Sequence, residues 1–251
     1  MTLKLKNSEP YTDIAEVYDY MLRYVDYEQW YQFIKSVMLK YVKSPVTVLE
    51  LGCGTGKFGA KFSSDNYQIF GIDKSINMLQ VARSRAFRNF KIICADIRNF
   101  CLKKNFDFIF SVHDTMNYQL TDAEIKDILK SAKNVMHKNS IFMFDITTEY
   151  NVESNFNNKT SFFKTRGINV EWTNKYDREK KHVISSFKIR HDNGKAYSEE
   201  HIQRIYSQDE ITSILKSEGF EILHICSDYT FNRPGADTVM INFITKKRDR
   251  A

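Results

Sequence analysis

Apolar side chains recur at helical spacing early in the chain and in short runs further along. Between residues 26 and 42 the positions i, i+3, i+4, i+7, i+8 and i+11 are Trp30, Phe33, Ile34, Val37, Met38 and Tyr41. This spacing predicts an amphipathic helix with one buried stripe. Short apolar runs predict strands at residues 46–51, 67–73, 90–96, 106–111 and 140–145. Helices are predicted from about residue 57, over 75–85, and after the capping box Thr121-Asp122-Ala123-Glu124. This alternation predicts βα units on a parallel sheet.

The pattern changes after the strand that ends near residue 145. An Asn-rich stretch, residues 151–160, is typical of a linker, and apolar and polar residues then alternate over 170–176 and 183–189. The hairpin signal Asp192-Asn193-Gly194 precedes another extended stretch, so we expect an antiparallel β insertion of three or four strands.

A final helix and two strands follow the insertion. A second capping box, Ser207-Gln208-Asp209-Glu210, begins the helix, and Gly219 ends it. Residues 220–226 and 238–245 have the pattern of strands, with no helical pattern between them, which predicts an antiparallel hairpin. The length of 251 residues suits one large α/β domain with small additions. We expect an N-terminal helical lid (1–44), an α/β domain (45–150 and 206–251) and the β insertion (151–205).

Composition and charge narrow the class of protein. Hydrophobic residues make up 42% and charged residues 27%, and no apolar run approaches the roughly 18 residues of a membrane span. The start of the chain, residues 1–6, lacks the apolar core of a signal peptide, which predicts a cytoplasmic protein without membrane contact. The net charge of +6 would suit an anionic partner, but the dense basic run is confined to residues 246–248 with Arg250. We interpret the excess as solvated surface, which disfavours nucleic acid as a partner.

The cysteines show no metal-ligand spacing. They are scattered, without a C-x-x-C pair or a Cys/His cluster, at positions Cys53, Cys94, Cys101 and Cys226. This pattern predicts four reduced thiols and no metal site.

The sharpest feature is a glycine-rich loop between a buried strand and a helix. It reads Glu50-Leu51-Gly52-Cys53-Gly54-Thr55-Gly56, and the helix that follows presents free N–H groups to a ligand. Glycine allows the backbone to approach a ligand closely and to adopt positive φ. Taken alone the loop is ambiguous, because residues 54–59 also match the G-x-G-x-x-G dinucleotide pattern and Asp73 lies about 20 residues on. An NAD(P)-binding oxidoreductase therefore stays an alternative.

Three further details separate the two interpretations. Glu50 precedes the first glycine, Asp96 closes the third strand, and the sheet ends in a hairpin. With these details the sequence resembles the class I S-adenosylmethionine-dependent methyltransferases. That resemblance implies a Rossmann-like seven-stranded α/β sheet with a reversed last strand and, in this chain, an antiparallel β insertion after strand five. It also implies S-adenosyl-L-methionine as the cofactor and S-adenosyl-L-homocysteine as the product.

The resemblance carries the family's cofactor contacts onto specific residues. The glycines would wrap the methionine part, Asp73 would hold the ribose hydroxyls, and Asp96 with Ile97 would hold the adenine. The full set of expected cofactor-binding residues is Tyr18, Glu50, Gly52, Gly54, Gly56, Asp73, Lys74, Met78, Asp96, Ile97 and Ser111.

Flanking segments narrow the resemblance. Residues 14–21 with 27–30, which contain A-x-x-Y-D-x-M and Y-x-x-W, resemble the A-x-x-Y-D-x-x-M … Y-x-x-W motif of bacterial small-molecule methyltransferases, with one residue fewer before the Met. Those enzymes include N-methyltransferases of nucleotide-linked amino sugars. Residues 110–118, 144–146 and the β insertion are similar too. The sequence has no sugar-nucleotide signature, so the acceptor stays open. It also lacks the N/D-P-P-Y/F tetrapeptide and the Pro-Cys nucleophile of other methylases.

Several residues are candidates for the acceptor side. His113 and Asp114 follow the fourth strand, where they could act as base or anchor, or only make local hydrogen bonds. Candidate substrate contacts are Tyr11, Asn117, Tyr118 and His201. Tyr11 and Tyr18 could equally be core aromatics, and His201 could merely pair with a neighbouring glutamate.

The expected reaction is in-line SN2 transfer of a methyl group to a nitrogen or oxygen of a small molecule. The protein would contribute mainly proximity and alignment. An amine acceptor needs no strong base, whereas a hydroxyl acceptor needs one, for which His113 is the candidate. An RNA-binding or RNA-methylating protein is a further alternative, motivated by the charge. We expect the β insertion to set acceptor choice, although its aromatic residues would also suit the interface of a homodimer, so monomer and homodimer both stay open.

Overall fold

The computed structural model describes residues 5–248 and contains a seven-stranded and a five-stranded sheet. The larger sheet has the order β11-β12-β6-β5-β2-β3-β4. Its strands are β2 (Thr47–Leu51), β3 (Gln68–Asp73), β4 (Phe90–Cys94), β5 (Phe106–Ser111), β6 (Met136–Thr147), β11 (Phe220–Ser227) and β12 (Met240–Lys247). Strands β2 to β6 are parallel, and β12 is antiparallel to both of its neighbours. The predicted parallel sheet with a reversed last strand is confirmed.

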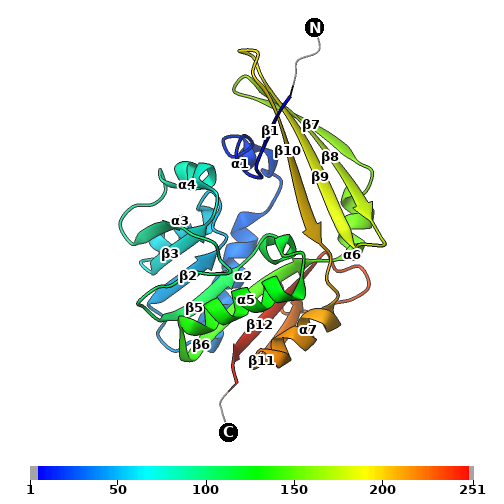
Figure 1. Ribbon diagram of the computed structural model, residues 1–251. Helices are drawn as coiled ribbons and strands as arrows, with labels where there is room; N and C mark the ends of the chain where they lie inside the picture. Colours follow the sequence, from blue (N-terminus) through cyan, green and yellow to red (C-terminus); the bar gives the residue numbers. More distant parts are fainter. Residues whose placement is uncertain (1–4, 249–251) are drawn as a thin grey trace.

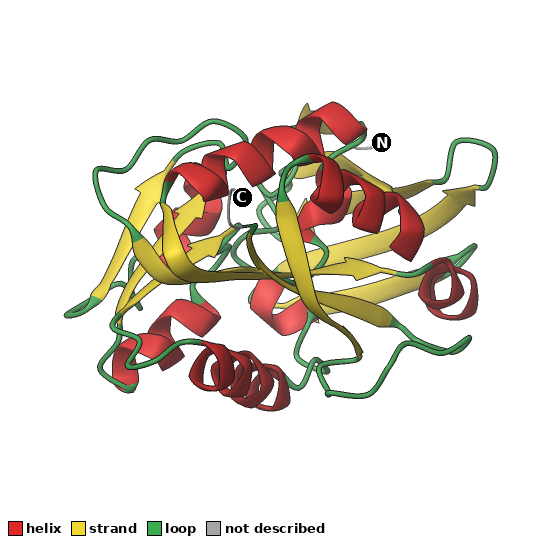
Figure 2. Cartoon of the chain, turned by 90° about the horizontal axis from the view of Figure 1, so that it is seen from below, coloured by secondary structure: helices red, strands yellow, loops and turns green. Residues whose placement is uncertain are grey.

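Helices cover both faces of this sheet (Figure 2). Helices α2 (Tyr27–Tyr41) and α3 (Lys57–Ser64) pack on one face, and α5 (Asp122–Asn134) and α7 (Gln208–Ser217) pack on the other. The short helix α4 (Ile76–Ala82) contacts β3 and β4. None of the helices in the described part of the chain is long and apolar enough to cross a membrane.

Helix α2 shows why the predicted lid range of 1–44 is too long. Its apolar stripe, with Ile34, Val37 and Met38 fully buried, packs on the central sheet rather than over a site. The side chain of Asp26 caps the helix by accepting two backbone N–H bonds. Apart from Tyr27, the first residue of α2, the N-terminal residues that line the cavities described below lie in the segment before this helix, which includes the short helix α1 (Tyr18–Met21).

The β insertion forms the second sheet, which stands over the carboxyl edge of the parallel strands (Figure 1). Its antiparallel strands are β7 (Thr160–Thr165), β8 (Ile168–Asp177), β9 (His182–His191) and β10 (Ala196–Arg204). A short N-terminal strand, β1 (Lys6–Ser8), pairs in parallel with β10. This strand corrects the expectation of an entirely helical N-terminal segment.

The Asn-rich stretch, which we expected to be a linker, is helical over residues 151–156. It contains α6 (Glu149–Asn151) and a π-helical turn (Val152–Phe156). The Thr148 hydroxyl accepts the N–H of Asn151 at 3.1 Å, and Asn155 donates to the Asn151 side chain at 2.9 Å. These local bonds, together with the buried Val152, favour the helical turn.

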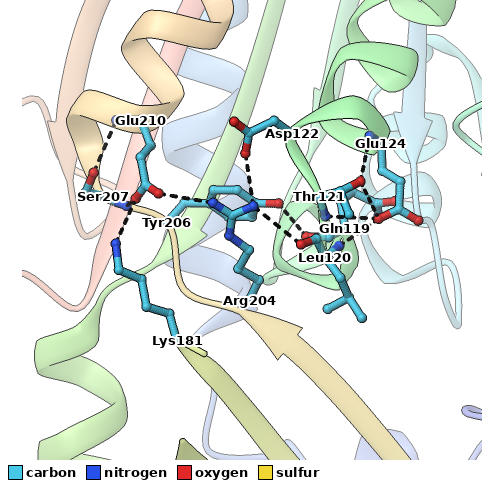
Figure 3. A network of polar contacts seen from close by, with 10 residues as sticks. All are labelled: Gln119, Leu120, Thr121, Asp122, Glu124, Lys181, Arg204, Tyr206, Ser207 and Glu210. Atoms are coloured by element: carbon cyan, nitrogen blue, oxygen red, sulfur yellow. Dashed lines mark hydrogen bonds and ion pairs between the residues drawn. The ribbon is translucent and has the colours of Figure 1, made fainter. Parts of the chain in front are cut away.

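A polar network fixes the end of the insertion to the larger domain (Figure 3). The guanidinium of Arg204, at the end of β10, pairs with Asp122 at 2.9 Å and with Glu210 at 3.1 Å. The hydroxyl of Tyr206 donates to the carbonyl of Gln119 at 2.6 Å. Both predicted capping boxes are present, with Glu210 in the second one, so the first turns of α5 and α7 are the anchor points.

Candidate active site

Two cavities lie at the carboxyl ends of the parallel strands. The first has a volume of about 160 Å³ and lies against the glycine loop. The second has a volume of about 100 Å³ and lies under the β insertion. Both are lined by Tyr11, Tyr18, His113 and Tyr118. These four side chains, which we call the shared wall, come from the N-terminal segment and from the loop after β5.

The glycine loop bends through backbone conformations that favour glycine. Gly52, Gly54 and Gly56 have φ values of 77°, 50° and 77°. A Cβ on Gly52 would lie 2.5 Å from the Thr115 side chain, so this position admits no larger residue without rearrangement. Gly52 and Gly54 line the first cavity. Gly56 lies instead against the Phe90 ring, and its part is to let the chain enter α3.

Two acidic residues of the central strands face the first cavity. The carboxylate of Asp73 accepts the N–H groups of Gly54 at 2.8 Å and Ser75 at 2.9 Å, which holds the glycine loop against β3. Glu50 is 3% exposed, and its Oε2 has no hydrogen-bond partner among the described residues. Burial, and secondarily the charge of Asp73, raises the pKa of Glu50 well above its usual range. A buried carboxyl oxygen without a partner, at the wall of a cavity, suits a ligand that brings a hydrogen-bond donor.

The far end of the first cavity is charged. Asp96 and Ile97 line it, and Asp96 pairs with Arg98 at 2.7 Å. The hydrogen bonds from Arg98 lower the pKa of Asp96, which keeps this acid ionised. Arg98 also lines the cavity and pairs with Glu124 at 2.5 Å, a role that the sequence pattern did not indicate.

The remaining expected cofactor residues divide into two groups. Lys74, Met78 and Tyr18 line the first cavity. Ser111 does not, because its hydroxyl donates to the Leu51 carbonyl at 2.9 Å inside the sheet and the residue is fully buried. Ser111 is therefore a link between β5 and β2 rather than a cavity residue.

His113 and Asp114 lie in a left-handed turn held by a buried carboxyl. Their φ values are 63° and 60°, and their N–H groups donate to Asp145 at 2.7 and 3.0 Å. Asp145 is fully buried and also accepts the hydroxyl of Tyr229. This turn directs His113 into the shared wall and Asp114 to the second cavity.

The side chains of this turn have unusual electrostatic surroundings. The imidazole of His113 lies 5.3 Å from the Trp30 ring, centroid to centroid, and burial followed by the charge of Lys57 lowers its pKa to about 4. Burial and the neighbouring Asp145 raise the pKa of Asp114 above its usual range. The Oδ1 atom of Asp114 is buried and has no partner within residues 5–248.

A chain of hydrogen bonds leads from the shared wall into the insertion. The Tyr11 hydroxyl donates to the Tyr118 hydroxyl at 2.5 Å, and the latter lies 3.1 Å from Nδ1 of His201. Nε2 of His201 lies 3.0 Å from Oε2 of Glu199. His201 lines the second cavity and pairs with Glu199, so the two roles considered for it are compatible.

Glu199 also holds the N-terminal segment. Its two carboxylate oxygens accept the backbone N–H groups of Tyr11 at 2.8 Å, Asp13 at 2.5 Å and Ile14 at 3.0 Å. A second anchor lies in α1, where Asp19 accepts the Thr55 hydroxyl at 2.7 Å. Asp19 also pairs with Arg85 at 2.7 Å, and Lys57 lies 3.7 Å from it.

Asn117 is not a cavity residue. Its side-chain amide donates to the Arg204 carbonyl at 2.8 Å and its oxygen accepts the N–H of Thr147 at 3.0 Å, in a fully buried position. Asn117 therefore joins the insertion to β6. The second cavity is lined instead by Trp172 and Phe187, whose rings stack at 5.5 Å, with Asn174, Ser185 and Gln203 as further polar residues.

Comparisons with known proteins bear on these cavities. Residues 48–139 match a family described as a methyltransferase domain, and this range includes the glycine loop, Asp73 and Asp96. The protein named "Putative methyltransferase YqeM" from Bacillus subtilis is 26% identical over 243 residues, which cover 94% of this chain and 97% of that protein. A crystal structure of an S-adenosylmethionine-dependent methyltransferase from Clostridium acetobutylicum is 25% identical, with a TM-score of 0.81 over 95% of this chain and 99% of that one.

A more distant structure shares the fold. The sugar N-methyltransferase KedS8 from Streptoalloteichus has a TM-score of 0.75 at 16% identity, over 93% of each chain. These similarities confirm the expected class I fold and its resemblance to this group of enzymes. They also favour the methyltransferase interpretation of the glycine loop, because the range that contains the loop matches a family described as a methyltransferase domain.

Proposed function

We propose that this chain, an S-adenosylmethionine-dependent methyltransferase by its domain and its fold, transfers the methyl group to a nitrogen or oxygen of a small molecule bound under the β insertion. The observation that carries this proposal is the pair of cavities with a shared wall. One cavity has the residues expected around the cofactor, and the other lies between that wall and the insertion. A transfer between two bound molecules requires this arrangement.

The first cavity suits S-adenosylmethionine residue by residue. The backbone of Gly52 and Gly54 would lie against the methionine part, and the unpaired carboxyl of Glu50 would accept a donor from it. Asp73 would accept the ribose hydroxyls, and Asp96 with Ile97 would bind the adenine. When bound, the cofactor supplies a methyl group on a positively charged sulfur, which is already activated for transfer.

The second cavity favours a small, partly apolar acceptor with polar groups. Its volume of about 100 Å³ and its aromatic lining suit a small molecule better than a nucleic acid strand. The unpaired carboxyl of Asp114 would bind a donor group of the acceptor. His113 would contact the reacting atoms from the shared wall, but a pKa of about 4 makes its imidazole a weak base at neutral pH.

Calorimetry and isotope transfer test this function. We expect micromolar binding of S-adenosylmethionine, and none of NAD, by isothermal titration. The protein is then incubated with methyl-labelled S-adenosylmethionine and a protein-free cell extract, and the label is followed into low-mass products. Label in added RNA, or heat with NAD alone, would refute the proposal. Gly54→Val, which fills the first cavity, is the control for labelling that is independent of the site.

A further inference from the structure

Tyr11 and Tyr118 of the shared wall form the outer end of a continuous hydrogen-bond chain. It runs from Tyr11 through Tyr118 and His201 to Glu199. We propose that this chain is a proton relay, which takes the proton released by the acceptor and delivers it to His201. The inference rests on the proposed function, since it specifies how the acceptor of that reaction loses its proton.

The positions of the four residues give the chain a direction. Tyr11 and Tyr118 line both cavities, His201 lines the second only, and Glu199 lines neither. The side chains of His201 and Glu199 are 3% and 0% exposed. The tyrosine end therefore faces both cavities, His201 faces the second, and Glu199 at the other end is closed to bulk water.

Glu199 determines which nitrogen of His201 carries a proton. One of its carboxylate oxygens accepts the N–H groups of Asp13 and Ile14, and the other accepts the N–H of Tyr11 and lies 3.0 Å from Nε2 of His201. Three backbone N–H donors on its two oxygens favour the carboxylate form, which only accepts hydrogen bonds. Nε2 of His201 is then the protonated nitrogen, and Nδ1 is free to accept a proton.

The tyrosines are oriented to match. The Tyr11 hydroxyl donates to Tyr118, so the Tyr118 proton is free to point at Nδ1 of His201. Each hydroxyl donates one bond inward, and the ionised Glu199 stabilises the imidazolium that results. The same division of roles between a hydroxyl, an imidazole and a buried carboxylate operates in hydrolase triads.

The proton balance of the step is complete. The lone pair of the acceptor forms a bond to the methyl carbon, and the electron pair of the broken carbon–sulfur bond stays on sulfur. The acceptor proton passes to the Tyr11 oxygen, the Tyr11 proton to Tyr118, and the Tyr118 proton to Nδ1 of His201. His201 ends as an imidazolium beside the Glu199 carboxylate, and no other reactant is needed.

The first test reads the imidazole directly. In protein labelled with ¹⁵N-histidine, nuclear magnetic resonance should show His201 at neutral pH as the tautomer protonated on Nε2. The signal is assigned by its loss in His201→Asn. A tautomer protonated on Nδ1 would overturn the relay, because that nitrogen could not accept a proton.

The second test measures transfer. His201→Asn keeps an acceptor oxygen near Tyr118 but cannot be protonated, so single-turnover transfer of label to the product of the extract should fall about 10²- to 10⁴-fold. Tyr118→Phe, which keeps the ring, should lose a similar factor. Binding of S-adenosylhomocysteine should stay within threefold in His201→Asn, because His201 does not line the first cavity. His182→Asn is the matched control, because His182 lies at the start of β9 and is not part of the hydrogen-bond chain. This variant should transfer the methyl group at the wild-type rate.

The outcomes separate the relay from the function on which it rests. Normal transfer by His201→Asn would overturn the relay while leaving the methyltransferase intact. If the wild-type protein binds S-adenosylhomocysteine but labels no small molecule, the proposed acceptor class fails, and the tautomer of His201 alone decides the relay.

Discussion

The backbone N–H of Ile14 donates to a carboxylate oxygen of Glu199 at 3.0 Å, although 185 positions separate the two residues in the sequence. With the bonds from Tyr11 and Asp13, it fixes the N-terminal segment to strand β10. The segment and the insertion thus form one structural unit around the cavities.

Glu199→Gln should lower the free energy of unfolding by about 3 kcal/mol, because its amide NH₂ would face two N–H donors in a buried site. Denaturant unfolding followed by circular dichroism measures the change. The neighbouring Glu200→Gln is the control, since Glu200 is exposed, and should change stability by less than about 0.5 kcal/mol. Equal stability of the two variants would show that the bonds to Glu199 contribute little.

Asp73→Ala should weaken S-adenosylmethionine binding by about 2–3 kcal/mol, or roughly 30- to 150-fold in Kd. The variant would lack the carboxylate that accepts the ribose hydroxyls and the N–H of Gly54. Isothermal titration measures the effect, and Asp65→Ala, on the loop after α3 and outside the cavity, is the control. An unchanged Kd would mean that the ribose binds elsewhere.

Gly54→Val should abolish cofactor binding and leave the chain folded. A Cβ at this position meets only the mobile end of Met78, at 3.2 Å, so the larger side chain extends into the cavity. Gly194→Val carries a comparable backbone cost, since Gly194 has a φ of 84°, but its Cβ would meet no atom within 4 Å. Circular dichroism and titration of both variants separate backbone strain from loss of the cavity. Normal binding by Gly54→Val would mean that the loop is only a turn.

The buried His113 should make the protein less stable in acid. Its pKa is about 4 in the folded protein and 6.5 in the unfolded chain, so the unfolded state binds more protons between these values. Stability therefore falls as the pH drops from about 6.5 to about 4. Across this window, the free energy of unfolding of His113→Gln should fall by about 3 kcal/mol less than that of the wild-type protein. This figure is the pKa difference multiplied by 1.36 kcal/mol for each pH unit. Parallel stability curves for the two proteins would contradict the assignment, and His182→Gln should keep the wild-type slope.

Local signals predicted most of the fold. The stripe from Trp30 to Tyr41, both capping boxes and the Asp192-Asn193-Gly194 turn each act within a few residues, and each is present. Strand β1 was missed because its three residues are too few to show alternation. Residues 1–4, which belong to the segment that lacks the features of a signal peptide, and Arg250 of the basic run lie outside the described residues.

The candidate site was predicted less completely, for a physical reason. A parallel strand buried on both faces shows no alternation, so the sequence did not distinguish Ser111, which bonds within the sheet, from residues that face a cavity. The sequence also did not show that Asn117 bonds to Arg204 and Thr147, because both partners lie in distant elements. The role of Glu199 depends on residues nearly 190 positions away, and no pattern of spacing reports such a contact.

The two anchors of the N-terminal segment have a kinetic consequence. Asp19 bonds the segment to the glycine loop, and Glu199 bonds it to the insertion. Tyr11 and Tyr18, which belong to the same segment, line both cavities. A displacement of this one segment would widen both cavities at the same time. If the two cavities hold the cofactor and the acceptor as proposed, we expect the spent cofactor and the methylated product to leave after one common displacement and with similar release rates.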